Sequence, residues 1–278
     1  MGRYYARNDG EPAEVADAIE MHYRPRFAGD RLPDGGVACA VALADKLESL
    51  AGLFSIGQLP TGEKDPFGLR RAALGIIRIL VEKDLPLSLS DLVSSAFTSD
   101  AFKNKTEIEV QEFVFDRLSG YLKELGYTAL QVEAVLSMGP AFLNLVPRQL
   151  DAVRAFQSLP EAESLAAANK RVSNLLRQAQ AKGESFVGAQ RAELREPAER
   201  ALQEAILTTS AKANPLFEAG DYAGYLKAFA VLKDPVDAFF DKVMVMVDEK
   251  ELRRNRLALL ADLRAAMNRV ADISKLAV

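Results

Sequence analysis

Apolar residues recur at helical spacing through almost the whole chain, and the alternating pattern typical of strands is nearly absent. The pattern therefore predicts an all-α protein. A polar run, TSDAFKNKTE (98–107), interrupts it and predicts a domain boundary near residue 100, giving domains at 1–100 and 101–278. Helices are expected near residues 12–23, 35–54, 66–83, 90–97, 106–126, 128–137, 147–157, 159–182, 193–219, 221–232, 235–247 and 249–275.

Two predicted helices near the C-terminus carry charges that need partners. The segment DPVDAFFDKVMVM (234–246) is apolar on nearly every side, which predicts a helix buried all round, with Asp234 as its N-cap and Pro235 at its first position. Asp237 and Asp241 lie four residues apart on one face, where like charges destabilise a helix. In the next helix Arg256 falls inside an apolar stripe, and a buried guanidinium needs a carboxylate. We therefore expect Arg256 to pair with Asp237 or Asp241. The stripe consists of Leu252, Leu259, Leu263, Met267 and Val270.

The composition is that of an ordinary globular protein, with 278 residues, 49% hydrophobic and 27% charged. The formal net charge is −4, so any nucleic-acid binding must come from a local basic face and not from bulk charge. A single cysteine excludes a disulfide framework within the chain, and a single histidine, His22, argues against a histidine-rich metal site. We find no secretory signal and no apolar run of about 18 residues, and so expect a cytoplasmic protein without a membrane partner.

The helix predicted over 159–182 divides by angle into an apolar face and a face that mixes cations with amides. Cations engage phosphates and amides reach base edges, so the polar face suits RNA, although an ordinary solvated face has the same pattern. The polar face comprises Lys170, Arg171, Asn174, Arg177 and Gln178, opposite Leu165, Ala168, Val172, Leu175, Leu176 and Ala179.

Two other sets of side chains are candidates for RNA contact. Arg253, Arg254 and Asn255 point away from the apolar stripe of the last helix. Arg70, Arg71 and Arg78 share roughly a third of the turn of the helix predicted from Pro66, where they could contact phosphates or form salt bridges. An aromatic stripe at Tyr222, Tyr225 and Phe229 fits core packing better than base stacking.

Several long blocks of this sequence resemble the C-terminal part of the β subunit of the bacterial heterotetrameric glycyl-tRNA synthetase. The blocks are MGRYYA (1–6), HYRPRFAGDRLP (22–33), VALADKLESLAGLFSIGQLPTGEKDPFGLRRAALGIIRIL (41–80), LAAANKRVSNLL (165–176), DPVDAFFDKVMVM (234–246), NRLALL (255–260) and VADISKL (270–276). The resemblance implies an HD-like helical domain, incomplete at its N-terminus, followed by a helical-bundle anticodon-binding (DALR-like) domain. It further implies binding of tRNA(Gly) through its anticodon region, with no DNA partner, and a hetero-oligomer with the α subunit when full length.

The resemblance also implies where chemistry should and should not occur. The α subunit is expected to carry ATP, Mg²⁺ and glycine activation, and this chain is expected to hold no catalytic residue, cofactor or metal. Asp45 in VALADKLE (41–48) matches a metal-binding aspartate of the HD superfamily, but one histidine and one aspartate do not complete the usual metal set. A metal-dependent HD phosphohydrolase and a purely architectural docking module are the alternatives.

Overall fold

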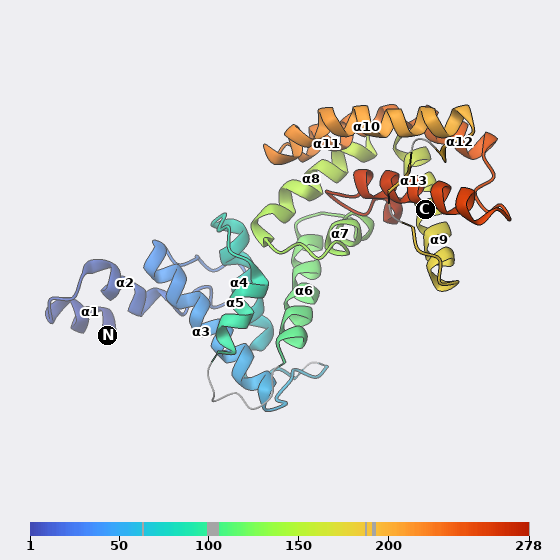
Figure 1. The fold of residues 1–278 in the computed structure, drawn as a ribbon. Coiled ribbons are helices and arrows are strands. Elements are labelled where there is room, and N and C mark those ends of the chain that lie inside the picture. Colours follow the sequence, from blue (N-terminus) through green and yellow to red (C-terminus); the bar gives the residue numbers. More distant parts are fainter. Residues whose placement is uncertain (63, 99–105, 187, 191–192, 278) are drawn as a thin grey trace. The chain divides into compact units, whose positions relative to one another are not determined.

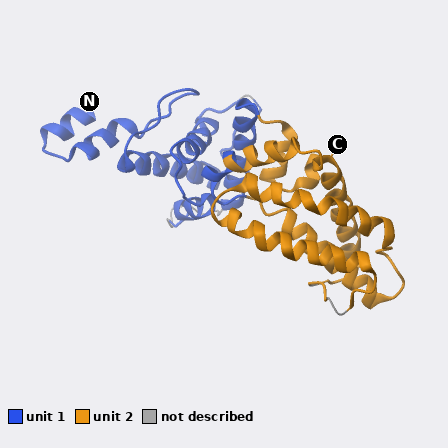
Figure 2. Cartoon of the chain, turned by 90° about the horizontal axis from the view of Figure 1, so that it is seen from above, with its two compact units in different colours: residues 1–126, 140–147 blue, residues 127–139, 148–278 orange. Residues whose placement is uncertain are grey.

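In the computed structural model, the described residues are 1–62, 64–98, 106–186, 188–190 and 193–277. They form helices joined by turns and loops, with isolated bridges but no sheet among them, so the all-α prediction is confirmed (Figure 1). The chain folds into two compact units. Unit 1 comprises residues 1–126 and 140–147, and unit 2 comprises residues 127–139 and 148–278 (Figure 2).

The boundary predicted near residue 100 falls in 99–105, which lies outside the described residues. The next helix, α6, belongs to unit 1 because it packs against α3, α4 and α5. The chain first passes from unit 1 to unit 2 after residue 126.

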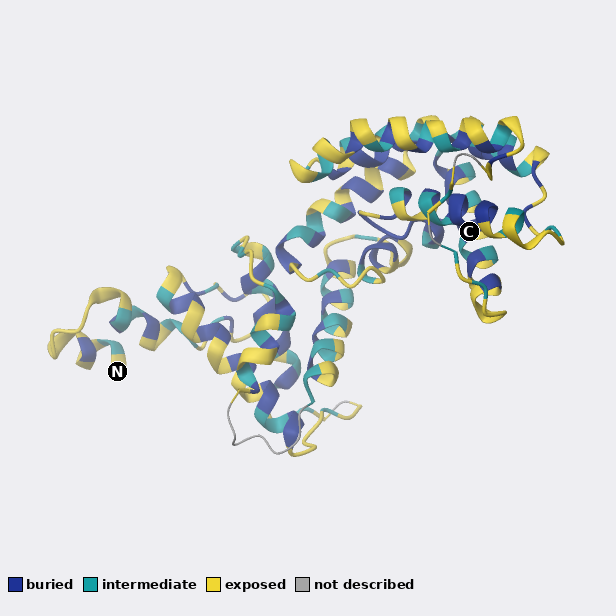
Figure 3. Ribbon diagram, viewed as in Figure 1, coloured by how far each residue is buried: buried dark blue, intermediate teal, exposed yellow. Residues whose placement is uncertain are grey.

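Unit 1 is a helical cluster around an aliphatic core. Helix α3 packs on α4, and α6 covers both. Leu50, Ile76, Leu80 and Val114 of these helices are fully buried. Figure 3 shows that each helix has buried stretches alternating with exposed ones. The elements are α1 (Gly2–Asn8), α2 (Ala13–Met21), α3 (Gly36–Ser55), α4 (Leu69–Glu82), α5 (Leu89–Ala96), α6 (Glu107–Glu124) and the short η1 (Leu143–Leu145).

The start of α4 differs from the prediction by one turn. The helix was expected at Pro66 but begins at Leu69, because Gly68 adopts a left-handed conformation (φ 68°) that interrupts the helical path. Asp65 nevertheless acts on this helix, since its carboxylate accepts hydrogen bonds from the backbone N–H groups of Leu69 (2.8 Å) and Arg70 (3.0 Å). It thereby satisfies two of the donors that have no partner within the first turn. The short helix α1 was not predicted.

Unit 2 packs its helices around α9, α10 and α13. Helix α9 contacts α13, α12 and η4, while α10 contacts α11, α12 and α13. The aromatic stripe at Tyr222, Tyr225 and Phe229 is buried in this core, as expected. The elements are α7 (Ala129–Leu136), α8 (Val146–Gln157, in unit 2 from Arg148), α9 (Ala162–Ala181), α10 (Pro197–Glu218), α11 (Tyr222–Ala228), η3 (Phe229–Leu232), α12 (Lys233–Lys242), α13 (Lys250–Met267) and η4 (Ile273–Leu276).

The segment 234–246 is not the all-round buried helix that its apolar pattern predicts. Helix α12 runs directly on from η3 and starts at Lys233, so Asp234 lies inside it and is not an N-cap. Pro235 is tolerated because the first-turn N–H groups have no partner within a helix. The helix ends at Lys242, and the chain leaves it in an extended conformation at Val243.

The buried Arg256 does have a carboxylate partner, but the predicted partners are wrong. Its Nε donates to Glu199 of α10, whose side chain is fully buried. Asp237 instead pairs with Lys233 in its own helix at 2.9 Å, and Asp241 is exposed. Arg256 also donates from Nη1 to the carbonyl of Met244 (2.8 Å), which ties the segment after α12 to α13.

Candidate nucleic-acid interface

The polar face of α9 is exposed as the sequence predicts. Lys170, Arg171, Asn174 and Arg177 are all exposed, while Leu165, Val172 and other apolar residues of the opposite face are buried against neighbouring helices. The residues KRVSNLLRQ place these four polar side chains within one side of the helix, because positions three and four apart share a face. The amphipathic division of α9 is therefore confirmed.

Side chains from other elements of unit 2 extend this face. The guanidinium of Arg171 lies over the ring of Phe240 in α12, 4.2 Å from its centroid. On another side of α9, Arg264 of α13 donates from Nε to the hydroxyl of Ser173 at 3.0 Å. The ammonium of Lys170 donates to the carbonyl of Ala277 at 3.1 Å. We call Lys170, Arg171, Asn174, Arg177 and Arg264 the α9 face.

The α9 face retains polar groups that are free to bind a ligand. Within the described ranges, Asn174 and Arg177 have no side-chain hydrogen bond or ion pair. Lys275 lies near Arg177, and the hydrogen bond from its ammonium to Glu133 (2.7 Å) raises its pKa, which keeps it charged. Arg264 and Lys275 were not identified from the sequence, because only the packing of α13 and η4 on α9 places them there.

The second predicted surface, Arg253, Arg254 and Asn255, is not a continuous exposed patch. Asn255 is buried and exchanges hydrogen bonds with the backbone of Gln190, donating from Nδ2 and accepting at Oδ1. Arg253 is engaged by Glu184 at 2.9 Å and by the carbonyl of Val247. Of the three side chains, Arg254 alone is exposed, because the segment before α10 covers this side of α13.

The three arginines of α4 do not form one phosphate-binding face either. Arg78 is mostly buried and forms an ion pair with Glu82 at 2.6 Å, four residues along the same helix. Arg70 and Arg71 instead line a cavity of about 800 Å³ in unit 1, together with residues of α6. Only two of the three therefore face space that a ligand can enter.

His22 and Asp45, which were weighed as possible metal ligands, do not form a metal centre with other described residues. The Nδ1 atom of His22 lies 3.3 Å from the carbonyl oxygen of Ala18, and the His22 carbonyl accepts a hydrogen bond from buried Lys46 at 2.9 Å. Asp45 is exposed. Across the described residues, no three histidine, cysteine or carboxylate side chains gather in a way that could hold a metal ion.

Comparisons with known proteins show that the sequence is similar to β subunits of glycyl-tRNA synthetases. Residues 1–137 match the family model "Glycyl-tRNA synthetase beta subunit", and residues 165–274 match "DALR anticodon binding domain", a range that contains α13 and all of α9 except its first three residues. The whole chain is similar to proteins named glycine–tRNA ligase beta subunit. The identity is 57% for the protein of Paracidovorax citrulli, 56% for that of Thiobacillus denitrificans and 54% for that of Methylobacillus flagellatus.

The chain spans about two fifths of the length of these relatives, namely 39%, 40% and 39% in the same order. Each match extends over 100% of this chain. No helix within the described part of the molecule is both long enough and apolar enough to cross a membrane.

Proposed function

The chain belongs to the glycyl-tRNA synthetase β-subunit family, and from this we propose that it is the part of a glycine–tRNA ligase that binds tRNA(Gly). In this proposal unit 2 contacts the anticodon region through the α9 face. The bond-making steps, with ATP and Mg²⁺, belong to the α subunit, with which the full-length protein assembles in the cytoplasm. This chain contributes by holding the tRNA in place, which turns binding energy into orientation of the reacting end.

The observation that carries the proposal is the composition of the α9 face. Lys170, Arg177 and Arg264 present positive charge to solvent, where it can neutralise phosphates, and Asn174 offers both a donor and an acceptor for a base edge. An anticodon loop exposes bases whose edges are accessible, which a duplex does not. The face therefore combines the two kinds of contact that a sequence-specific RNA site needs.

Arg171 has a more specific role in the proposal. Its guanidinium is held over the Phe240 ring, so its position is fixed by a cation–π contact before RNA arrives. A positioned guanidinium loses less side-chain entropy on binding than a free lysine and presents a planar fork to a phosphate. We expect Arg171→Lys to weaken binding even though the charge is kept.

The test is a triple variant, Lys170→Ala, Arg171→Ala and Arg177→Ala, assayed for binding to tRNA(Gly) over a range of salt concentrations. If each cation contacts one phosphate, the dependence of log affinity on log salt should flatten by roughly 2 to 3 units. Changing the anticodon of the tRNA should weaken binding to the unmodified chain and have little further effect on the triple variant.

A matched control removes three exposed lysines of unit 2 that do not lie on α9, Lys212, Lys227 and Lys250. This control changes the net charge by the same amount and should leave the anticodon dependence intact. If the two triple variants bind tRNA equally, or if the α9 variant folds and binds as the unmodified chain does, the α9 face is not the site. If the chain binds no tRNA even at low salt, an architectural docking role is favoured instead.

A further inference from the structure

Unit 1 contains a cavity whose lining is strongly cationic although the chain as a whole is acidic. The cavity is about 800 Å³ in volume and lies between the loop after α2 and helices α4 and α6. Five cationic side chains line it, against two carboxylates, Asp116 and Glu124. The cations are Arg26, Arg70, Arg71, Arg117 and Lys123. Such an excess of positive charge in one concave surface attracts an anion.

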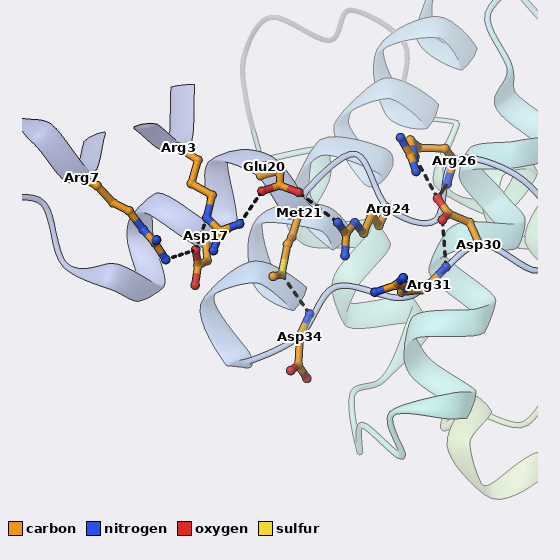
Figure 4. A network of polar contacts seen from close by, with 10 residues as sticks. All are labelled: Arg3, Arg7, Asp17, Glu20, Met21, Arg24, Arg26, Asp30, Arg31 and Asp34. Carbon is orange, nitrogen blue, oxygen red and sulfur yellow. Dashed lines mark hydrogen bonds and ion pairs between the residues drawn. The ribbon is translucent and has the colours of Figure 1, made fainter. Parts of the chain in front are cut away.

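Arg26 is held in position by a buried carboxylate. Asp30 is only 7% exposed and accepts hydrogen bonds from the Nε of Arg26 (3.0 Å) and from its backbone N–H (2.8 Å), as Figure 4 shows. The hydrogen bond from the Arg26 side chain is the largest cause that lowers the pKa of Asp30, to about 2. Within the Arg26 side chain only Nε donates a hydrogen bond to a described residue, and the side chain is 61% exposed. Its two terminal nitrogens therefore remain available to a ligand.

The side chains of the other four cations of the cavity also have hydrogen-bond donors without a partner among the described residues. The side chains of Arg71 and Lys123 have no hydrogen bond or ion pair among the residues that the structure describes. Arg117 pairs with its neighbour Asp116, but its Nε is buried without a partner in the described part of the chain. Arg70 donates one terminal nitrogen to the carbonyl of Gly62 at 2.6 Å. The cavity therefore holds donors that its own carboxylates do not occupy.

Exposed aromatic rings lie beside these cations. Phe27 lines the cationic cavity, and Tyr23 and Phe67 line a neighbouring cavity of about 370 Å³ that shares Arg26 and Arg71 with it. All three rings are more than half exposed, which is unusual for side chains of this size. The Tyr23 ring lies against His22, with 3.9 Å between the ring centroids, and is therefore supported from one side.

We propose that these two cavities form a groove for an unpaired RNA strand, with phosphates at Arg26 and Arg71 and bases stacked on Phe27, Tyr23 or Phe67. Alternating cations and exposed rings suit a single strand, because only unpaired bases offer their faces for stacking. The proposal rests on the proposed function, since tRNA would supply the strand, and it adds a second RNA site in unit 1. The strand would come from a segment of the tRNA other than the one bound by the α9 face.

The test uses a fluorescein-labelled single-stranded RNA of roughly eight nucleotides, a length within the range of known single-strand sites. Binding to the 278-residue chain is followed by fluorescence anisotropy, with the same sequence in a duplex for comparison. A second copy of the strand carries 4-thiouridine, and cross-linked peptides are identified by mass spectrometry. We expect the single strand to bind more tightly than the duplex and to cross-link within residues 23–27 or 67–71.

Two variants separate charge from stacking. Arg71→Ala should weaken binding and reduce the salt slope by about 0.7, the value for one phosphate contact to a single strand. Phe27→Ala should weaken binding roughly 5- to 150-fold, the range for one lost stacking contact, without changing the salt slope. Arg31→Ala is the matched control, because Arg31 is exposed in the same unit and does not line either cavity.

The proposal is overturned if the duplex binds as tightly as the single strand, if cross-links appear only in unit 2, or if Arg31→Ala weakens binding as much as Arg71→Ala. These results do not depend on the α9 face. An α9 triple variant that still binds tRNA normally would refute the proposed function of that face, and the cross-links in unit 1 would stand.

Discussion

Replacing Arg256 with methionine leaves the carboxylate of Glu199 buried without its cation. Both side chains are almost completely inaccessible, with 6% of Arg256 and none of Glu199 exposed. Methionine fills a similar volume, so the change removes charge and hydrogen bonds with little effect on packing. The Met244 carbonyl loses its donor as well, and the segment between α12 and α13 loses one of its attachments.

The expected cost follows from this geometry. Removing one partner of a buried ion pair typically destabilises a protein by about 3–5 kcal/mol, because the remaining charge is uncompensated. Glu199 keeps two hydrogen bonds, from the backbone N–H groups of Arg195 (2.7 Å) and Glu196 (3.0 Å), which favours the lower end of that range. We expect a loss of about 3 kcal/mol. For a unit of this size it corresponds to a fall of roughly 6–12 °C in the melting temperature.

The assay is thermal and urea unfolding followed by far-UV circular dichroism, with hydrogen exchange of the α10 and α13 amides to assign the loss to unit 2. Arg254→Met is the control, because Arg254 is exposed two positions before Arg256 in the same helix. A third variant combines Arg256→Met with Glu199→Gln. The glutamine still accepts from the backbone N–H groups but carries no charge, so it should restore about 1–2 kcal/mol.

Two results would refute this reasoning. One is an unfolding midpoint for Arg256→Met equal to that of Arg254→Met, which would mean that the pair contributes nothing to stability. The other is a double variant less stable than Arg256→Met alone, which would mean that the uncompensated charge of Glu199 is not the source of the cost.

Two smaller predictions concern the hydrogen bonds of Asp30 and of Tyr225. The pKa of Asp30 is lowered to about 2 in the folded state, below its unfolded value of 3.8, so its interaction with Arg26 stabilises the fold at neutral pH and is lost as the pH falls through about 2. Asp30→Asn should therefore be destabilising at pH 7, and urea unfolding should show the difference from the unmodified chain vanishing between about pH 4 and pH 2. Tyr225 is fully buried and donates its hydroxyl to the carbonyl of Ala266. Tyr225→Phe should cost about 1 kcal/mol in urea unfolding, and no change in midpoint would mean that the carbonyl finds another donor.

The sequence predicts α9 well because one periodic signal decides its structure. Its apolar and polar residues separate by angle, so both the helix and its exposed face could be inferred before any contact was known. The same reasoning fails at 243–247, which was predicted as the end of a helix. The run VMVMV is too short for its apolar pattern to distinguish a helix from an extended segment. Contacts with the next helix decide it, because Arg256 and Arg253 of α13 donate hydrogen bonds to the carbonyls of Met244 and Val247.

The partner of Arg256 could not be predicted for a related reason. The stripe of α13 shows that a buried guanidinium needs a carboxylate, but Glu199 lies 57 residues earlier and looks like an ordinary acid in the first turn of α10. Similarly, Asn255 was expected to point away from the stripe, although it lies three residues after Leu252 and four before Leu259, and nothing local indicates that residues near Gln190 cover it. A signal was present in the apolar run LALL (257–260), which points to burial on more than one side.

These outcomes suggest how to separate cations that serve the fold from cations that are available to the proposed RNA ligand. Arg253, Arg256 and Arg78 are engaged by carboxylates within reach of each guanidinium, and their hydrogen bonds already serve the fold. Arg177 and Arg71 have no such partner among the described residues, and each lies where a ligand can approach. Arg78 and Arg71 share one face of α4, so neither residue type nor helical angle separates the paired arginine from the unpaired one. The separation depends on tertiary neighbours. Because the chain has a net charge of −4, the proposed affinity for RNA would rest on these few unpaired cations, and removing them should weaken binding and flatten its dependence on salt.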